Sequence, residues 1–577
     1  MTMLTKWGAA LDRSCPLPEY PRPQLRRESF YNLNGVWDYA VTPSGDEPGV
    51  WDGEIVVPFS PEAPLSGAAR GPAKDEYLHY RRGFTLPEGF QKSRVLLHFG
   101  AVDQIAEVFI NGVSAAKHSG GYWPFSTDIT SLLREGENIL RVTVRDNADD
   151  PTFAYGKQRY KRGGMWYTAQ SGIWQTVWLE SMPEVYVKSL RITPEFDEAR
   201  VRIELETALE SSAAITCDVR AADGSFVAGS WAKGGVCVVP LPGFRAWTPD
   251  DPYLYTLDIT CGEDRVESYF AMRKFSYVEL GGHKVFGLNN APLFHNGLLD
   301  QGYYPDGLLT PPSDEAMVND IETMKRCGFN MLRKHIKIEP LRWYYHCDRL
   351  GMIVWQDMVS GGQPYSFLHV SALPTLGKVD LPDQDAKPYG RSGVLSRARF
   401  RREMADTVRL LYNCPCIALW TVFNEGWGQF DALDMANELK KLDPTRFIDH
   451  ASGWQDQGYE EMKSRHIYFR PVKLKNDGRA LALTEYGGYI LAVDGHRWTD
   501  KVFGYRICRN SAALAHDYEK LMLGQVLPHI RKEGLTAAVY TQITDVEEEL
   551  NGLMTYDREV LKIPEETLRE INKQLKF

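Results

Sequence analysis

Two glutamates stand where a strand should leave the core of the protein. Glu425 follows the apolar run IALWTVFN and Glu485 follows ALALT, and glycine and aromatic residues come next in both places instead of residues that cap a helix. Two carboxylates that face each other across a pocket, one protonated and one ionised, can hydrolyse a glycosidic bond. A single glutamate at a strand end is more often a cap or an ion-pair partner, so the prediction depends on the pair.

The elements that would hold this pair are those of a barrel. After about residue 279, helix-like and strand-like segments alternate to the end of the chain, which is typical of repeated βα units. Eight strand-like segments predict a (β/α)8 TIM barrel over residues 279–577, with Glu425 after the fourth strand and Glu485 after the seventh. The reactive residues of such a barrel lie at the C-terminal ends of its strands, so both glutamates should reach the same mouth.

The other strand ends offer polar and aromatic side chains that could hold a substrate. His335 in LRKHIK ends the second strand, although a packed histidine with Lys334 and Lys337 turned to solvent is the alternative. Aromatic side chains more often pack than bind, but aromatic faces also form the walls of sugar sites. The candidate substrate-binding residues are Asp300, Asp306, His335, Asp357, Asn424, Trp454, His466, Tyr468 and Tyr540.

Two β-rich blocks precede the predicted barrel. From about residue 35 to residue 180, short runs of alternating apolar and polar residues are separated by Gly, Asp and Asn turns, which predicts a β-sandwich domain over residues 1–181. A second block over residues 182–278 repeats the pattern, and its length of about 95 residues fits an immunoglobulin-like sandwich. Both blocks would present β-sheets and no long helix.

Composition excludes some classes of partner. The net charge of −10 and the pI near 5.8 argue against a nucleic acid or an anionic membrane surface as the main partner. The first residues lack the apolar core of a secretory signal, no long uncharged apolar run occurs, and nine scattered cysteines fit a reduced compartment. We therefore expect a soluble, cytoplasmic protein that spans no membrane.

Several separate stretches resemble glycoside hydrolase family 2, the family of β-galactosidases, β-glucuronidases and β-mannosidases. The family's sugar-binding jelly-roll domain is resembled by YNLNGVWDYA, HSGGYWPFSTDIT and SGIWQTVWLE, and its strand-two histidine motif by LRKHIK. The acid/base signature is similar to NCPCIALWTVFNEG, and the nucleophile motif is similar to LTEYGG. The resemblance runs over nearly the whole chain and implies a jelly roll, an immunoglobulin-like sandwich and a catalytic barrel.

The resemblance also implies roles for the two glutamates. In a retaining mechanism, Glu485 would be the nucleophile and Glu425 the general acid/base, with Asn424 beside it to hold the 2-hydroxyl of the sugar. No cofactor enters this chemistry, and the metal ligands of the large β-galactosidases find no counterparts here, so no metal site is expected. The stretch Asn413-Cys414-Pro415-Cys416 replaces the usual Asn-His-Pro-Ser, and we expect this change to be structural.

The expected substrate is a terminal β-galactoside. β-Glucuronidases carry an Asn-x-Lys motif after the nucleophile, and this chain has none after Glu485. The alternatives are a β-glucuronide or galacturonide, a β-mannoside, an α-L-arabinoside, or a carbohydrate-binding protein without turnover. Members of the family often form oligomers, so the expected partners are a small carbohydrate and further copies of the chain. The candidate hydroxyl ligands are Asp300, Asp306, His335, Asp357 and Tyr468, with Tyr540 as a candidate wall.

Overall fold

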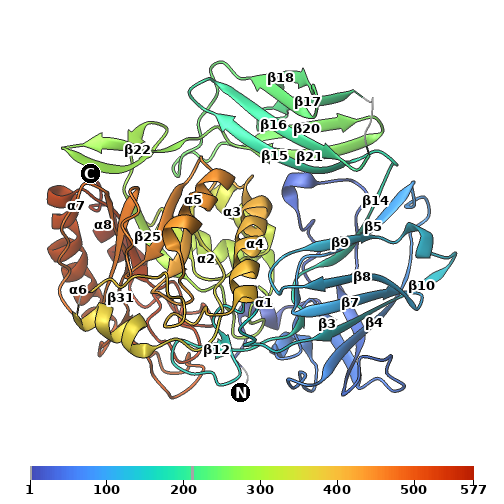
Figure 1. Cartoon of the computed structure of the whole chain (residues 1–577), viewed down its shortest axis with the longest axis horizontal. Helices are drawn as coiled ribbons and strands as arrows, with labels where there is room; N and C mark the ends of the chain where they lie inside the picture. Colours follow the sequence, from blue (N-terminus) through green and yellow to red (C-terminus); the bar gives the residue numbers. More distant parts are fainter. Residues whose placement is uncertain (1–2, 210–213, 378) are drawn as a thin grey trace.

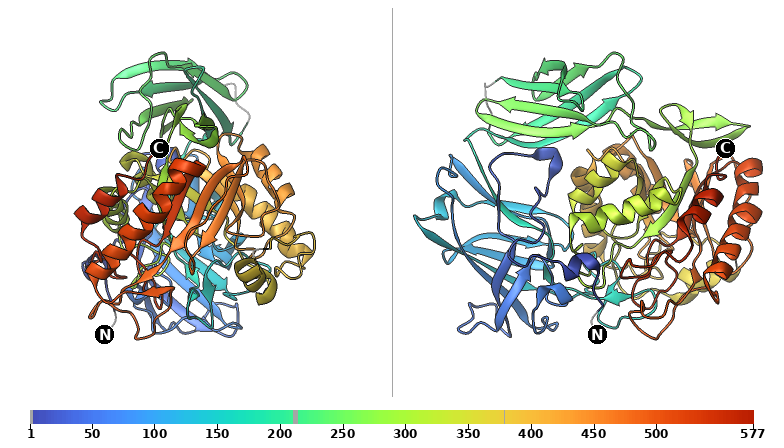
Figure 2. Two further views of the ribbon diagram at one scale, coloured as in Figure 1. Left: turned by 90° about the vertical axis from the view of Figure 1, so that its left-hand side faces the viewer. Right: turned by 180° about the vertical axis from the view of Figure 1, so that it is seen from behind.

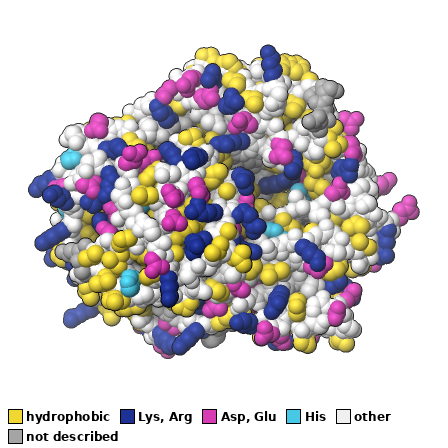
Figure 3. Space-filling view, in the orientation of Figure 1, with side chains coloured by type: hydrophobic (Ala, Val, Ile, Leu, Met, Phe, Trp, Pro, Cys, Tyr) yellow, Lys and Arg dark blue, Asp and Glu magenta, His cyan; other side chains and the backbone are white. Residues whose placement is uncertain are grey.

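Three parts of the chain pack together in the computed structural model, which describes residues 3–209, 214–377 and 379–577 (Figure 1). An N-terminal β-sandwich lies against one side of a barrel, and a second β-sandwich lies across the top of both (Figures 1 and 2). The predicted fold class of a jelly roll, an immunoglobulin-like sandwich and a TIM barrel is confirmed. Basic and acidic side chains are interspersed over the face of the molecule in Figure 3.

The N-terminal sandwich consists of two antiparallel sheets whose inner faces share one apolar core. Its strands alternate between buried and exposed positions, as a sheet with one covered face requires. The four-stranded sheet contains β1 (Tyr31–Asn32), β14 (Val177–Met182), β5 (Arg94–Phe99) and β9 (Phe125–Asp128). The six-stranded sheet contains β3 (Gly53–Val57), β2 (Gly35–Thr42), β4 (Tyr77–Thr85), β10 (Glu137–Arg145), β7 (Ile105–Ile110) and β8 (Val113–Ser119).

The second sandwich also packs two antiparallel sheets face to face. Strand β20 alternates strictly between buried and half-buried residues, and three cysteines lie in this core as free thiols, Cys217, Cys237 and Cys261. One sheet contains β15 (Val187–Glu195), β16 (Arg200–Thr207) and β19 (Val236–Pro240). The other contains β18 (Phe226–Trp231), β17 (Ile215–Arg220), β20 (Tyr255–Cys261) and β21 (Asp264–Phe270).

Eight parallel strands form the barrel, and each is buried along its whole length or nearly so. In spatial order they are β25 (His295–Asp300), β26 (Met331–Lys334), β27 (Ile353–Asp357), β28 (Ile417–Asn424), β29 (Phe447–Ser452), β30 (Met462–Ile467), β31 (Ala480–Gly487) and β34 (Leu535–Thr541). Between β29 and β30 the hydroxyl of Ser464 donates to Asp449 and to the carbonyl of Ala451, both at 3.0 Å. Side-chain bonds therefore join the two strands where the regular ladder is interrupted.

Helices cover the outside of the barrel. The side chain of Ser313 caps the first of them by accepting from the N–H of Ala316. In the described part of the chain, two segments adopt π-helical geometry: Leu368–Gly377 inside the long loop after β27, and Met522–Val526 between α6 (Ser511–Leu521) and α7 (Leu527–Glu533). Within the described ranges, none of the helices is both long and apolar enough to cross a membrane. The helices are α2 (Asp314–Arg326), α3 (Leu341–Leu350), α4 (Val394–Leu411), α5 (Ala432–Leu442), α6 (Ser511–Leu521), α7 (Leu527–Glu533) and α8 (Glu565–Asn572).

A small antiparallel sheet lies at the end of the barrel where its strands begin. It consists of β22 (Phe275–Leu280), β23 (His283–Leu288) and β24 (Ala291–Pro292), and the expected domain boundary between residues 278 and 279 falls inside it. Phe286 is fully buried, stacks on Phe447 at a centroid distance of 4.2 Å and meets the edge of Trp355 at 5.9 Å. This sheet therefore plugs the bottom of the barrel and leaves the opposite end as the mouth.

We expect Phe286→Ala to lower the free energy of unfolding of the barrel by about 3–5 kcal/mol, because it opens a cavity among aromatic rings that cannot collapse. Hydrogen exchange of the barrel strands measures this loss separately from the two sandwiches. The matched control is Phe226→Ala on β18, whose ring is 59% exposed and should leave the exchange rates unchanged. Equal effects of the two variants would show that the sheet does not support the barrel.

Candidate active site

The turn after β28 places Glu425 at the mouth of the barrel. Glu425 has a φ of +53°, in the left-handed region that residues other than glycine rarely adopt, and Gly426 and Gly428 follow with φ of +71° and +68°. The backbone N–H of Glu425 donates to the carbonyl of Ser452 (2.9 Å), and the indole N–H of Trp454 donates to the carbonyl of Glu425 (2.9 Å). These bonds hold a backbone conformation that costs about 1–3 kcal/mol.

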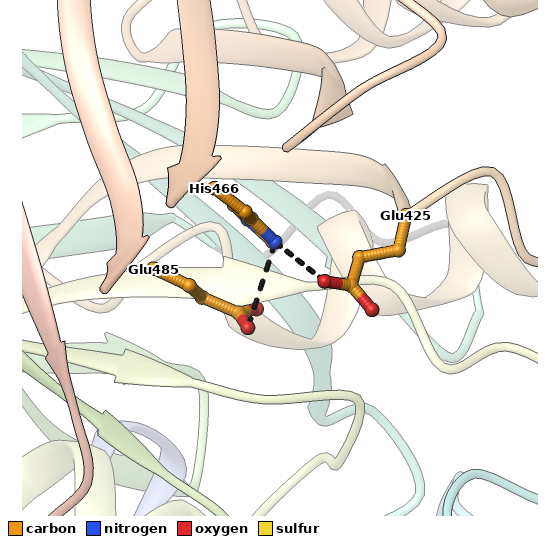
Figure 4. Close-up of side chains that lie close together, drawn as sticks. All are labelled: Glu425, His466 and Glu485. Carbon is orange, nitrogen blue, oxygen red and sulfur yellow. Dashed lines mark hydrogen bonds and ion pairs between the residues drawn. The ribbon is translucent and has the colours of Figure 1, made fainter. Parts of the chain in front are cut away.

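His466 lies between Glu425 and Glu485, and the three side chains converge (Figure 4). Its Nδ1 atom is 2.8 Å from Oε1 of Glu425 and 3.5 Å from Oε2 of Glu485. One oxygen of each carboxylate and a nitrogen of the imidazole all lie within 4.8 Å of one another. The barrel thus brings together two carboxylates from the ends of its fourth and seventh strands.

Arg333 on β26 connects these carboxylates to the rest of the site. Its guanidinium is fully buried and donates to both oxygens of Asp357 at 2.9 and 3.0 Å. The same group donates to Oε1 of Glu485 at 3.1 Å and to Oδ1 of Asn424 at 2.8 Å. A buried charge requires such partners, since an unpaired one is strongly destabilising. Arg333 therefore fixes three side chains from three other strands.

The two glutamates have different electrostatic surroundings. Burial raises the pKa of Glu425, although Lys157, His335 and Arg333 act in the opposite direction. Glu485 instead accepts hydrogen bonds from Arg333 and from the hydroxyl of Tyr468, the latter at 2.5 Å. The first environment favours a carboxyl group that keeps its proton, and the second holds the oxygens of Glu485 in place through two donors.

His466 is a neutral imidazole at ordinary pH. Burial lowers its pKa to about 3, and its second nitrogen, Nε2, lies 3.2 Å from the hydroxyl of Ser452. The Ser452 hydroxyl in turn lies 3.0 Å from that of Thr484. A neutral imidazole has one donor and one acceptor nitrogen, and a hydroxyl serves either. Nδ1 of His466 can therefore accept a hydrogen bond from a protonated Glu425, or donate one to an ionised Glu425, according to the tautomer of the ring.

Several candidate binding residues lie in this network. Asn424 uses its Oδ1 for Arg333, which leaves its amide N–H groups without a protein acceptor among the described residues. His335 directs Nδ1 to Asp357 at 2.8 Å, and in the described part of the chain its Nε2 bonds no protein atom. Although burial opposes it, Arg333 and His335 lower the pKa of Asp357 to about 2. Trp454, His466 and Tyr468 border the two glutamates directly.

Two other candidates, Asp306 and Tyr540, lie elsewhere. Asp306 is fully buried and accepts from the backbone N–H and the hydroxyl of Thr5, both at 2.7 Å, so it serves the N-terminal segment. Tyr540 is fully buried against the rings of Tyr486 and Tyr518, on the helix side of the barrel wall, and forms no wall of the site. The strand-end rule selected both, but it cannot tell which way a side chain points.

Asp300 belongs to a neighbouring ion-pair cluster. Its carboxylate accepts from Lys334 at 2.7 Å, and Lys334 also donates to Glu339 at 2.8 Å. Lys334 and Lys337 are both buried, so the alternative that turned them to solvent is wrong. Asp300 is thus held by lysine, away from the bonds of the two glutamates.

Two residues of the network were absent from the sequence prediction. Arg333 stands inside the apolar strand FNMLRKH, and a charge in a buried strand was the available signal. Tyr505 stacks on Tyr468 with centroids 3.8 Å apart, and it comes from a loop that no strand-end rule covers. Trp427, after Glu425, packs against Tyr155 and Trp166 of the jelly roll at centroid distances of 5.8 and 5.1 Å.

Among the residues that the structure describes, two groups of side chains have the geometry to hold a metal ion. One is the set of Glu425, His466 and Glu485 itself, and the other is the set of His496, Asp557 and Glu559. In each group the potential ligand atoms lie within 4.8 Å of one another. The first group has no need of a metal to act as an acid and a nucleophile, since a protonated and an ionised carboxyl suffice.

A cavity of about 220 Å³ lies between the jelly roll and the barrel. Its walls include Arg22, His98, Trp178, Asp314 and Arg342. None of the residues of the Arg333 network lines it, so this cavity is separate from the two glutamates.

Comparisons with known proteins agree with this arrangement. Three family models match the chain: the sugar binding domain of glycosyl hydrolases family 2 at residues 64–183, glycosyl hydrolases family 2 at residues 185–273, and the TIM barrel domain of the same family at residues 311–474. The three matches follow one another along the chain in the order of the three parts of the fold.

Individual relatives are more distant. A β-galactosidase of Thermoanaerobacter pseudethanolicus is 24% identical over 64% of this chain and 47% of its own, and a β-glucuronidase of Paenibacillus borealis is 22% identical over 82% and 85%. A solved β-glucuronidase of an uncultured Clostridium sp. shares the fold with a TM-score of 0.75 at 18% identity, over 96% of this chain and 99% of its own. The chain spans less than half the length of four curated relatives it matches.

We expect Arg333→Met to destabilise the barrel by about 3–5 kcal/mol at neutral pH, because it leaves Asp357 and Glu485 as buried charges with a lost partner. The loss should shrink below about pH 4, where Asp357 without its arginine becomes protonated. In the native protein the depressed pKa of Asp357 contributes stability above the ordinary aspartate pKa, and that contribution is lost as pH falls through about 2.

Hydrogen exchange of the barrel strands at several pH values measures this pattern. The matched control is Arg401→Met on α4, a pair with Glu438 that is 34% and 42% exposed and should cost less than about 1 kcal/mol at any pH. A loss of the same size at pH 3 and pH 7 would contradict the role of Arg333 as the partner of these carboxylates.

Proposed function

The chain belongs to glycoside hydrolase family 2, and we propose that it is a retaining exo-β-glycosidase that removes terminal β-linked sugars, with β-galactosides as the leading substrates. One observation carries the proposal: Glu425 and Glu485 each place a carboxylate oxygen within 4.8 Å of the other. Retaining enzymes hold their two carboxyl groups about 5–5.5 Å apart, and inverting enzymes about 6.5–9.5 Å apart. The short separation supports double displacement.

In the first step, a carboxylate oxygen of Glu485 attacks the anomeric carbon and forms a glycosyl ester. The bond from that carbon to the leaving oxygen breaks, and Glu425 transfers its proton to this oxygen. The buried setting that raises the pKa of Glu425 supports its role as the acid. The hydrogen bonds of Arg333 and Tyr468 hold the Glu485 carboxylate in place for the attack.

In the second step, the ionised Glu425 takes a proton from a water molecule, whose oxygen attacks the anomeric carbon and releases Glu485. Glu425 thus needs a partner both as an acid and as an anion. His466 supplies one, since its neutral ring can accept from the protonated carboxyl through Nδ1 and, as the other tautomer, donate to the ionised one. The hydroxyl of Ser452 complements either tautomer at Nε2.

Two free polar groups support sugar binding beside these carboxyls. The amide N–H groups of Asn424 are placed to donate to the 2-hydroxyl, and Nε2 of His335 is an acceptor for another hydroxyl. The sequence favours a galacto-configured sugar. A β-uronide is the second candidate, because several curated and solved relatives are named β-glucuronidases and because Lys157 brings a positive charge to the site.

A panel of p-nitrophenyl glycosides tests the proposal. We expect the galacto-configured β-glycosides to be hydrolysed with the highest kcat/KM, ahead of the gluco, manno and arabino counterparts. Proton NMR should detect the β-anomer of the released sugar first, because two displacements restore the starting configuration. Glu485→Gln should abolish turnover, whereas Glu438→Gln on α5, whose side chain is 42% exposed, should leave it unchanged. The α-anomer as first product, or a fully active Glu485→Gln variant, would refute the mechanism.

Glu425→Ala should lower kcat/KM on substrates with poor leaving groups by about 10²–10⁴-fold and affect activated aryl glycosides far less in the first step, since general acid catalysis is then dispensable. Added azide should restore turnover and yield the β-glycosyl azide. The native enzyme should lose activity on poor leaving groups as pH rises through the raised pKa of Glu425, because the acid must be protonated. A variant that keeps this alkaline limb would show that another group is the acid.

A further inference from the structure

A loop of the jelly roll crosses the mouth of the barrel. It contains β11 (Gln158–Arg159) and β12 (Tyr167–Thr168), and in Figure 1 β12 lies below the barrel, at the end opposite β22. The N–H groups of Tyr155 and Gly156 donate to the carbonyl of Ser360 at 3.1 and 2.9 Å. Ala154 forms a β-bridge with Gly361. The first half of the loop is thus bonded to the segment that follows barrel strand β27.

Three consecutive acids after β34 hold the second half of the loop. Glu547 accepts from the N–H of Thr168 at 2.9 Å, and Glu548 accepts from the N–H of Gly164 at 2.9 Å. The hydroxyl of Tyr167 donates to Glu549. These bonds attach residues of the jelly roll to the last strand end of the barrel. The loop is therefore a fixed wall of the site.

Lys157 is placed by this wall. Its carbonyl accepts from the N–H of Tyr167 at 3.0 Å, and its ammonium lies 5.6 Å from the centroid of the Trp166 ring. Trp166 meets Trp427 edge to face at 5.1 Å, and Trp427 is two residues beyond Glu425. The side chain of Lys157 is therefore held against the ring that packs on the turn carrying the proposed acid.

The ammonium of Lys157 has no carboxylate partner in the described part of the chain. Three acids of the site have other partners: Glu485 and Asp357 bond Arg333, and Glu549 bonds Tyr167. The two arginines of the loop are paired, Arg159 with Asp149 and Arg162 with Glu547. A half-buried cation with only an aromatic ring beside it has free capacity for an anion.

The field of Lys157 reaches the reacting groups. It is the foremost of the charges that lower the pKa of Glu425 and of Glu549 against the effect of burial. Glu425 and Glu549 follow different strands, β28 and β34, so the charge of Lys157 acts on two strand ends of the mouth. An anionic group of a bound sugar would meet this positive charge.

We infer that Lys157 is a specificity-determining residue that binds an anionic group of the substrate sugar, the carboxylate of a uronic acid or a sulfate ester. This inference rests on the proposed function. An ammonium on a flexible stem suits either group, because it binds as a point charge and makes charge-assisted hydrogen bonds in several directions. A neutral sugar would leave the ammonium unpaired, so among galacto-configured sugars the discrimination should favour the one that carries an anionic group.

The test compares the aryl β-galactoside with its galacturonide, its 6-sulfate and the β-glucuronide, on the full-length wild-type enzyme and on Lys157→Met. For the anionic substrate that the wild type prefers, Lys157→Met should lower kcat/KM by about 10- to 100-fold, mainly through KM. The neutral galactoside should change less than about threefold. The preferred anion, carboxylate or sulfate, identifies the group that Lys157 binds.

Lys161→Met is the matched control, because Lys161 is an exposed lysine of the same loop. This variant should leave kcat/KM unchanged for every substrate. Lys157→Arg should restore part of the preference for the anion. Equal losses on neutral and anionic substrates, with a shifted pH profile, would mean that Lys157 only tunes Glu425 and would overturn the inference. So would anionic substrates that are unaffected by Lys157→Met.

Calorimetric binding of methyl β-galacturonide, methyl β-galactoside and its 6-sulfate separates this inference from the proposed function. A wild-type protein that hydrolyses no glycoside, yet binds an anionic sugar more tightly than the galactoside and loses the difference in Lys157→Met, would refute the function and support the role of Lys157. If the wild type hydrolyses the galactoside, and if the wild type and Lys157→Met each bind anionic and neutral sugars equally, the function would be supported and the role of Lys157 refuted.

Discussion

The fully buried guanidinium of Arg333 is the interaction on which the site depends. It donates to Asp357, Asn424 and Glu485, and these three residues come from three other barrel strands. A planar group with five donors can satisfy several carboxylate and amide oxygens at once, which an ammonium cannot. Its partners must stay in place, since a buried charge that loses one is costly. The ends of the barrel strands are thereby locked to one another by charge as well as by the backbone ladder.

This lock creates an asymmetry between the two glutamates. Glu485 receives two donors from fixed side chains, Arg333 and Tyr468, whereas Glu425 projects from a strained turn and meets only the imidazole of His466. Burial raises the pKa of Glu425 against the opposing charges of Lys157, His335 and Arg333. Identical residue types thus have different surroundings, and different surroundings are what give paired catalytic carboxyls their separate roles in general. His466 can serve both states of Glu425 because it is neutral and has a hydroxyl behind it.

The mouth of the barrel is completed by another domain. The jelly-roll loop around residues 154–168 is bonded to the segments after β27 and β34, and its Trp166 packs on Trp427. The packing of the jelly roll on the barrel therefore has a structural result. The jelly roll supplies a wall and a cation to a site whose carboxyl groups belong to the barrel. The sheet that plugs the opposite end, with Phe286 at its centre, keeps the chemistry at this mouth.

The sequence by itself determined the order of strands and helices and the positions of Glu425 and Glu485, because apolar runs and strand ends are local patterns and a barrel gathers all its strand ends at one mouth. The direction in which each side chain points, and its distance from the site, were decided by the tertiary structure. Tyr540 ends a strand yet packs toward the helices, and Asp306 bonds Thr5, because alternation along a strand and the path of a loop set which face a side chain joins. Lys157 reaches the mouth from a different domain, a contact that no local pattern encodes.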